Sequence, residues 1–148
     1  MTNRANKMRK DSRLSRILHA IIHIHFLEKA VTSEKLGKML QTNPVVVRRT
    51  MALLKEAGYV TSVKGHNGGW SLIKPLSDIT LFDIYKVVGE GSLFTIGLTD
   101  EHTNCPIEKA VNSSLDGVMS EAETLMLTRF KEITIESLAK NFEGESKV

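Results

Sequence analysis

The chain has 148 residues, of which 41% are hydrophobic, 25% are charged and 5% are aromatic. These values are typical of a soluble globular protein with a substantial core, and they exclude a disordered chain. The longest apolar run is far shorter than the roughly 20 residues of a membrane span, and the basic N-terminus lacks the apolar segment of a secretory signal. A single cysteine excludes an internal disulfide, so we expect a protein of the reducing cytoplasm.

The net charge of +3 is distributed unevenly along the chain. Residues 1–75 hold 14 Lys/Arg and 4 Asp/Glu, a formal charge of +10, whereas residues 76–148 hold 6 Lys/Arg and 13 Asp/Glu, a charge of −7. A strongly basic half beside an acidic half indicates that the basic half meets a polyanion. The alternative is a solvated surface that is asymmetric by chance. It is the weaker interpretation because the halves differ by 17 charges.

Two helices are predicted in the first 40 residues. The first begins at Asp11 or Ser12, carries apolar residues three and four positions apart, and ends near Ala30. A short second helix follows over residues 33–40, because Thr32 or Ser33 can serve as its N-terminal cap.

The third helix is predicted over residues 44–57, after a turn at residues 41–43. Asn43 is a favourable N-cap, Pro44 takes the first helical position, and Gly58 supplies the C-terminal stop. Its inner face is expected to hold Val47, Thr50, Met51 and Leu54, so the side chains free to face outward are Val45, Val46, Arg48, Arg49 and Lys55.

A β-hairpin is predicted after the third helix. Residues 59–63 and 70–73 have the composition of strands, and the glycine-rich segment 64–69 forms the tip between them. Thr80 then caps a helix over residues 81–88. The order helix–helix–turn–helix–hairpin is that of a winged helix-turn-helix. The predicted fold class is therefore mostly α with a small β-hairpin wing.

The C-terminal half predicts an irregular loop and a long helix. Residues 90–104 lack a periodic pattern, and a loop of this length is usually functional or disordered. A long helix is predicted over residues 106–131 and a short one over residues 135–141. At about 1.5 Å per residue the long helix spans roughly 39 Å, too long to fold back on so small a domain. We expect a second copy of the chain to cover its apolar face, at Leu115, Val118, Met119, Ala122 and Met126.

A winged helix places its third helix in the DNA major groove, which is about 12 Å wide. Arg48 and Arg49 can reach guanine edges or phosphates, and the wing glycines allow close approach to a phosphate chain. Two arginines alone would indicate surface ion pairs, but the turn, the wing and the basic half together favour DNA. The predicted contacts to double-stranded DNA are Thr32, Ser33, Thr42, Asn43, Val45, Val46, Arg48, Arg49, Lys55, Lys64, His66, Asn67 and Gly68.

Other chemistry is not indicated by the sequence. His19 and His23 are four residues apart and could bind a metal, but no carboxylate or cysteine joins them at ligand spacing. Packed helix histidines are the better interpretation, and Trp70 is expected to anchor the hairpin. No nucleophile triad, paired carboxylates or phosphate loop is present, so we predict that the protein is not an enzyme. The alternative function is a winged-helix adaptor that binds a protein partner instead of DNA.

The chain resembles the Rrf-two family of bacterial winged-helix transcription regulators over most of residues 12–142. The matching blocks are VTSEKLGKMLQTNPVVVRRTMALLKEAGYV, KGHNGGWSLIKPLSDITLFDIYKVV, NCPIEKAVNSSLDGVMSEAETLML and ITIESLAKNF. The resemblance implies a DNA-binding domain at residues 1–89, and a sensor loop and crossed dimerisation helix at residues 90–148. It also implies a homodimer that binds a palindromic operator near a promoter. We expect a repressor, and an activator is the alternative.

One departure from the family concerns the cysteines. Cluster-binding members carry three cysteines around the loop before the long helix, whereas this chain has only Cys105. One thiolate cannot hold a cysteine-ligated iron–sulfur cluster, so the resemblance is to the cluster-free branch, and no cofactor is expected. Cys105 is either a small apolar residue packed under the loop or a redox thiol, because helix N-termini favour the reactive thiolate. The expected effector is an oxidant or a small molecule.

Overall fold

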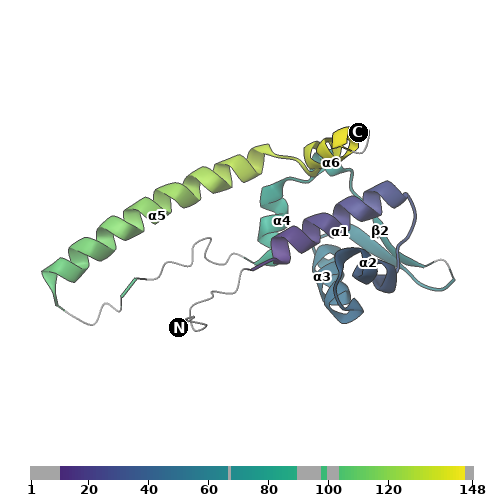
Figure 1. Cartoon of the computed structure of the whole chain (residues 1–148), viewed down its shortest axis with the longest axis horizontal. Coiled ribbons are helices and arrows are strands. Elements are labelled where there is room, and N and C mark those ends of the chain that lie inside the picture. Colours follow the sequence, from purple (N-terminus) through teal and green to yellow (C-terminus); the bar gives the residue numbers. More distant parts are fainter. Residues whose placement is uncertain (1–10, 67, 90–97, 100–103, 146–148) are drawn as a thin grey trace, which may run out of the picture.

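The computed structural model describes residues 11–66, 68–89, 98–99 and 104–145. Its elements are α1 Arg13–Leu27, α2 Ser33–Leu40, α3 Pro44–Glu56, β1 Val60–Val63, β2 Gly69–Leu72, the short 3-10 helix η2 Leu76–Asp78, α4 Leu81–Val88, α5 Pro106–Glu132 and α6 Ile135–Glu145. Three helices followed by a hairpin confirm the predicted winged helix-turn-helix (Figure 1). Most of the predicted loop at 90–104 lies outside the described residues.

The start of α1 is fixed by Asp11 rather than by Ser12. Ser12 is the N-cap residue, but its side chain makes no capping hydrogen bond. The carboxylate of Asp11 instead accepts the backbone N–H of Arg13 at 3.1 Å and the guanidinium of Arg13 at 2.7 Å. The side-chain hydrogen bond from Arg13, followed by the backbone one, lowers the pKa of Asp11 to about 2.

The core lies where α1, α2, α3 and α4 meet the hairpin. Its large, fully buried side chains are Ile17, Ile21, Val31, Leu36, Val47, Met51, Leu54, Val60, Ile79, Ile84 and Ile135. α3 contributes Val47, Met51 and Leu54, as its periodicity predicts, while Thr50 is half-buried. One apolar face of α3 therefore holds it in the domain, and the opposite face remains available for contacts.

The hairpin is attached to the start of α2. β1 and β2 are antiparallel, with Val60 opposite Leu72. Val31 adds to the hairpin edge, because its N–H donates to the Trp70 carbonyl at 3.0 Å and its carbonyl accepts the Trp70 N–H at 2.8 Å. The indole N–H of Trp70 also donates to the Ser33 hydroxyl at 2.9 Å, which confirms that Trp70 anchors the hairpin.

α6 shares the core of the winged-helix domain, although the predicted boundary at residue 89 assigns it to the C-terminal unit. Ile135 and Ala139 are buried in this core, and the Ile135 N–H donates to the Ile79 carbonyl at 2.8 Å. The helix also continues to Glu145, beyond its predicted end at residue 141. The chain therefore returns to the winged-helix domain at the end of α5 (Figure 1).

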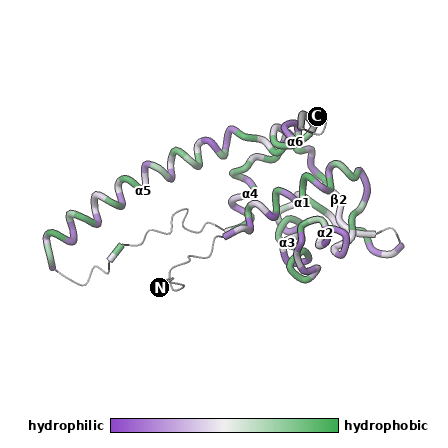
Figure 2. The backbone as a smooth tube through the Cα atoms, in the orientation of Figure 1, coloured by the Kyte–Doolittle hydropathy of each residue, from purple (hydrophilic) through white to green (hydrophobic). Residues whose placement is uncertain are grey.

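α4 packs against the C-terminal end of α5. It begins with a capping box, in which Thr80 accepts the Asp83 N–H at 3.1 Å and the Asp83 carboxylate accepts the Thr80 N–H at 2.9 Å. Tyr85 of α4 packs edge-on against Phe130, with ring centroids 6.1 Å apart. Beyond this contact α5 extends away from the domain (Figures 1 and 2). Among the described helices, none combines the length and the apolar character that crossing a membrane requires.

Candidate nucleic-acid interface

The turn between α2 and α3 is held by caps at both helix starts. Thr32 Oγ1 accepts a first-turn N–H of α2 at 3.1 Å, and Asn43 Oδ1 accepts the Val45 N–H at 2.8 Å. A Cβ on Gly37 would lie 2.8 Å from the Thr42 carbonyl oxygen, so only glycine fits where the turn folds back. α3 therefore has a fixed position relative to α2, which a helix that reads a DNA groove requires.

Five of the thirteen predicted DNA contacts lie on α3. Val45, Arg48, Arg49 and Lys55 are exposed, as are Thr32 and Asn43 beside them, while Thr42 and Val46 are half-buried. Val45, which is 48% exposed, lies in the first turn of α3. An exposed valine at this end of a groove-reading helix suits contact with a thymine methyl group.

The three cations on α3 differ in their partners. Arg48 Nη2 donates to Glu34 Oε1 at 2.7 Å, and Lys55 Nζ donates to Ser62 Oγ at 2.9 Å. Arg49 has no hydrogen bond or ion pair within the part of the chain that the structure describes. The ion-pair alternative therefore applies to Arg48, whereas the guanidinium of Arg49 is open to a ligand.

The tip of the wing requires glycine. Gly65 has a φ of 94°, and a Cβ on Gly68 would lie 2.3 Å from the Val63 carbonyl oxygen. Lys64 and His66 are exposed at the tip, and Gly68 is half-buried. Asn67, the remaining contact predicted here, lies outside the described residues.

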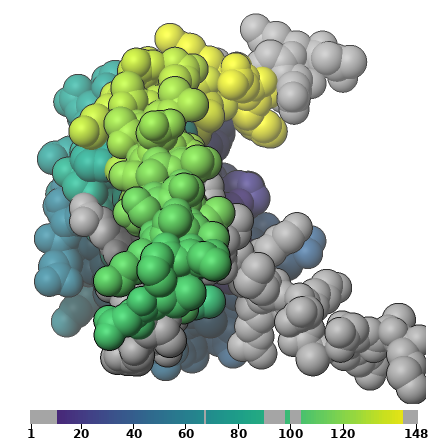
Figure 3. Space-filling model, turned by 90° about the vertical axis from the view of Figure 1, so that its left-hand side faces the viewer, coloured from purple at the N-terminus to yellow at the C-terminus, as the bar shows by residue number. Residues whose placement is uncertain are grey.

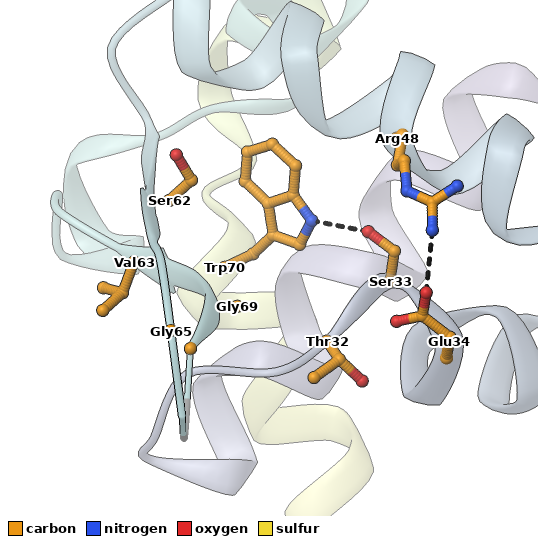
Figure 4. A pocket seen from close by; sticks show the side chains of 10 residues that line it. Thr32, Ser33, Glu34, Arg48, Ser62, Val63, Gly65, Gly69 and Trp70 are labelled. Carbon is orange, nitrogen blue, oxygen red and sulfur yellow. Dashed lines mark hydrogen bonds and ion pairs between the residues drawn. The ribbon is translucent and has the colours of Figure 1, made fainter.

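A hollow of about 320 Å³ lies between the wing, the start of α2 and Arg48 of α3. Figure 4 shows Arg48 and Glu34 joined on one side of it, with Val63 and Gly65 of the hairpin on the other. The lining residues are Thr32, Ser33, Glu34, Arg48, Ser62, Val63, Gly65, Gly68, Gly69 and Trp70. Residues from α2, α3 and the hairpin thus share one surface, and its concave form suits a nucleic-acid backbone strand.

Ser33 is a predicted DNA contact that the structure corrects. The residue is only 8% exposed, and its hydroxyl accepts the indole N–H of Trp70. The sequence allows either Thr32 or Ser33 to cap α2, and in the structure Thr32 is both the cap and the exposed residue. The hydroxyl of Ser33 therefore anchors the hairpin, although the residue also lines the hollow beside the wing.

Of the three histidines of α1, His23 is half-buried, whereas His19 and His25 are exposed, so the packed-residue interpretation applies to His23 alone. Burial, followed by the charge of His19, lowers the pKa of His23, which favours the neutral imidazole. In the described parts of the chain, no group of three or more His, Cys, Asp or Glu side chains is placed to hold a metal ion.

One exposed side of α5 is apolar. Its exposed apolar side chains are Ile107, Val111, Leu115, Val118 and Leu125, which are 75%, 50%, 42%, 66% and 66% exposed. Together with the half-buried Ala122 they lie three or four residues apart and form one stripe, which we call the α5 stripe. Figure 3 shows α5 in front of the other described elements along most of its length.

The predicted dimer interface overlaps this α5 stripe only in part. Leu115, Val118 and Ala122 belong to it, but Met119 and Met126 are half-buried on the adjacent side of the helix. Each of these methionines follows a stripe residue directly, and one residue turns a helix by about 100°. Ile107, Val111 and Leu125 are stripe residues that the predicted interface omits, and their spacing is the signal that identifies them.

Cys105 is exposed and occupies the N-cap position of α5, where its side chain makes no capping hydrogen bond. Its exposure contradicts the interpretation of a small residue packed under the loop. Of that loop, Leu98, Thr99 and Asn104 are described, and Thr99 accepts a hydrogen bond from Asn112 Nδ2 at 3.3 Å through its carbonyl. Asn112 is the buried residue of α5.

Comparisons with known proteins agree with this arrangement. Residues 11–141 match the model of the Rrf2 family, which is described as an iron-dependent transcriptional regulator. YwnA of Bacillus subtilis (strain 168), named as an HTH-type transcriptional regulator, is 33% identical over 117 residues, covering 78% of this chain and 86% of YwnA. These relatives are transcriptional regulators and not enzymes.

Solved structures of the same fold are also similar. A transcriptional regulator from Lactobacillus plantarum superposes with a TM-score of 0.76 at 24% identity, covering 89% of this chain and 90% of that one. IscR of T. potens superposes with a TM-score of 0.68 at 22% identity, covering 95% of this chain and 93% of that one. At these identities the structures support the fold alone.

Proposed function

The chain belongs to the Rrf2 family of transcriptional regulators, and from this premise we propose that it is a homodimeric repressor that binds a palindromic DNA operator. The observation that carries the proposal is the shared surface of α3 and the wing. Arg48 of α3 and the wing line one hollow. The exposed Arg49 and Val45 lie on the same helix, which would enter the major groove, and the exposed Lys64 and His66 lie at the wing tip. A dimer bound to an operator near a promoter would block that promoter in the bacterial cytoplasm.

The α5 stripe supports the dimer. Five exposed apolar side chains and the half-buried Ala122, repeated three and four residues apart, form a surface that water solvates poorly. A second α5 from an identical chain offers the same stripe, and a two-fold axis pairs the two without a further partner. Such a dimer addresses two half-sites about 34 Å apart, or a multiple of that distance.

We expect DNA binding to depend steeply on salt. The predicted contacts of each copy include four cations, Arg48, Arg49, Lys55 and Lys64, so a dimer can neutralise up to about eight phosphates. The slope of log affinity against log salt concentration should then be about −4 to −7. Fluorescence anisotropy provides the measurement, with a duplex that the protein enriches from a random-sequence library. A flat salt response would favour the adaptor function over DNA binding.

The residues present do not fit the iron–sulfur cluster of cluster-binding relatives. The whole chain has one cysteine, and a cysteine-ligated cluster requires several thiolates. We therefore place the protein in the cluster-free part of the family, with no cofactor.

Cys105 is the proposed signal input. It is exposed and directly precedes the helix that carries the α5 stripe, so an adduct on its sulfur would act on the dimer geometry that DNA reads. Cys105→Ser is expected to keep operator affinity and to lose the response to peroxide, while the parent protein loses affinity at least several-fold. The check is anisotropy before and after peroxide treatment, with mass spectrometry of the thiol. If oxidant leaves the parent protein's affinity unchanged, the effector is a small molecule bound elsewhere.

A further inference from the structure

Glu34 lies where a DNA-binding protein would be expected to avoid a negative charge. It is in the first turn of α2 and lines two hollows, the one beside the wing and a second of about 560 Å³ beside the α2–α3 turn. Of the described residues that line these two hollows, Glu34 is the only acidic one. A carboxylate here repels any phosphate that approaches the α2 N-terminus or the wing.

The ion pair with Arg48 stabilises the folded protein too little to explain why a carboxylate is present at position 34. Glu34 Oε1 and Arg48 Nη2 are 2.7 Å apart, but the two side chains are 62% and 53% exposed. Exposed pairs of this kind contribute little to folding, because water already solvates both charges and ordering two long side chains costs entropy. The main effect of the ion pair is therefore to restrict the positions that the Arg48 guanidinium can adopt.

An unrestrained arginine on this surface would bind the nearest phosphate, which carries no sequence information. Glu34 holds one nitrogen of the Arg48 guanidinium, Nη2, through a hydrogen bond (Figure 4). Its negative charge repels phosphate from the surrounding surface. The remaining N–H donors of the planar group stay available, and guanine O6 and N7 accept such donors in the major groove.

We propose that Glu34 is a specificity-determining residue, which withholds Arg48 from the phosphate backbone and presents it to a guanine edge in the operator. The proposal rests on the proposed DNA-binding function. It identifies the ligand of Arg48 as a base, whereas the open Arg49 remains free to take either a base or a phosphate.

The test is Glu34→Gln, which keeps the shape of the side chain and removes its charge. Affinity is measured for the duplex that the parent protein enriches from a random library and for a shuffled duplex of equal composition. The variant should bind the shuffled duplex about five- to tenfold more tightly, with a salt slope steeper by about 1.8, because each copy of the dimer gains one phosphate contact. Its preference for the enriched duplex should fall by about tenfold.

Asp116→Asn is the matched control, since Asp116 is exposed on α5, lines neither hollow and gives the same change in charge. The double variant Glu34→Gln/Arg48→Ala should show less gain on shuffled DNA than Glu34→Gln alone, because the gain comes from Arg48. If Glu34→Gln binds both duplexes as Asp116→Asn does, the proposal is wrong while the DNA-binding function stands. If the parent protein enriches no duplex, both fail together.

Discussion

Val118→Glu is expected to dissociate the dimer and to remove operator binding in the same step. Val118 is 66% exposed at the middle of the α5 stripe, and a two-fold interface would bury two copies of the new carboxylate close together. Burying an unpaired charge costs about 3 kcal/mol or more, so the dimer should weaken by at least about 100-fold. Sedimentation velocity at micromolar concentration measures the dissociation, and anisotropy measures the loss of operator affinity.

Ser120→Glu is the control for this variant. Ser120 is exposed on α5 two residues farther along, which places it on nearly the opposite side of the helix. The Ser120→Glu variant introduces the same charge into the same helix and should leave both the dimer and its operator affinity unchanged. A stable monomer of the parent protein, or a Val118→Glu variant that still sediments as a dimer, would remove the α5 stripe from the interface.

Gly69→Ala is expected to destabilise the domain by about 3 kcal/mol or more. A Cβ at Gly69 would lie 2.5 Å from both the carbonyl carbon and the carbonyl oxygen of Val31, and the φ of Gly69 is 139°. Val31 cannot move aside without breaking its two backbone hydrogen bonds to Trp70. The wing would then separate from α2, and urea unfolding followed by circular dichroism should show the loss of stability.

Gly117→Ala provides the contrasting case. Gly117 lies in the middle of α5, and nothing lies within 4 Å of the Cβ position. Alanine there should therefore stabilise the protein by about 0.5–1 kcal/mol, since it restricts the unfolded chain and favours the helix. If Gly69→Ala unfolds at the same urea concentration as the parent protein, the attachment of the wing to Val31 is wrong.

The elements of the winged helix could be predicted because local residues determine their ends. Asn43 and Pro44 start α3, Thr80 starts α4, and Gly89 with its φ of 96° ends α4. The inner face of α3 also followed from its period, since only one side of that helix is apolar. Each of these signals acts within a few residues, so a single sequence contains it in full.

The parts that the sequence did not reveal depend on contacts between distant residues. Ser33 resembles a surface cap residue until the fold brings Trp70, 37 positions later, onto its hydroxyl. Glu34 and Arg48 are 14 positions apart and meet only because the turn folds α2 against α3. The apolar pattern of α5 is wide, so periodicity alone could not separate the exposed stripe from Met119 and Met126 on the adjacent side.

Hydroxyl-radical and dimethyl sulfate footprinting on the library-enriched duplex is the most direct test that this protein is a dimeric, groove-reading regulator. Two protected half-sites are expected, related by a two-fold axis and centred about 34 Å apart or a multiple of it. Guanine N7 atoms within them should be shielded by α3 in the major groove. Absence of protection, or protection that is equal on shuffled DNA and leaves guanine N7 reactive, would contradict the account.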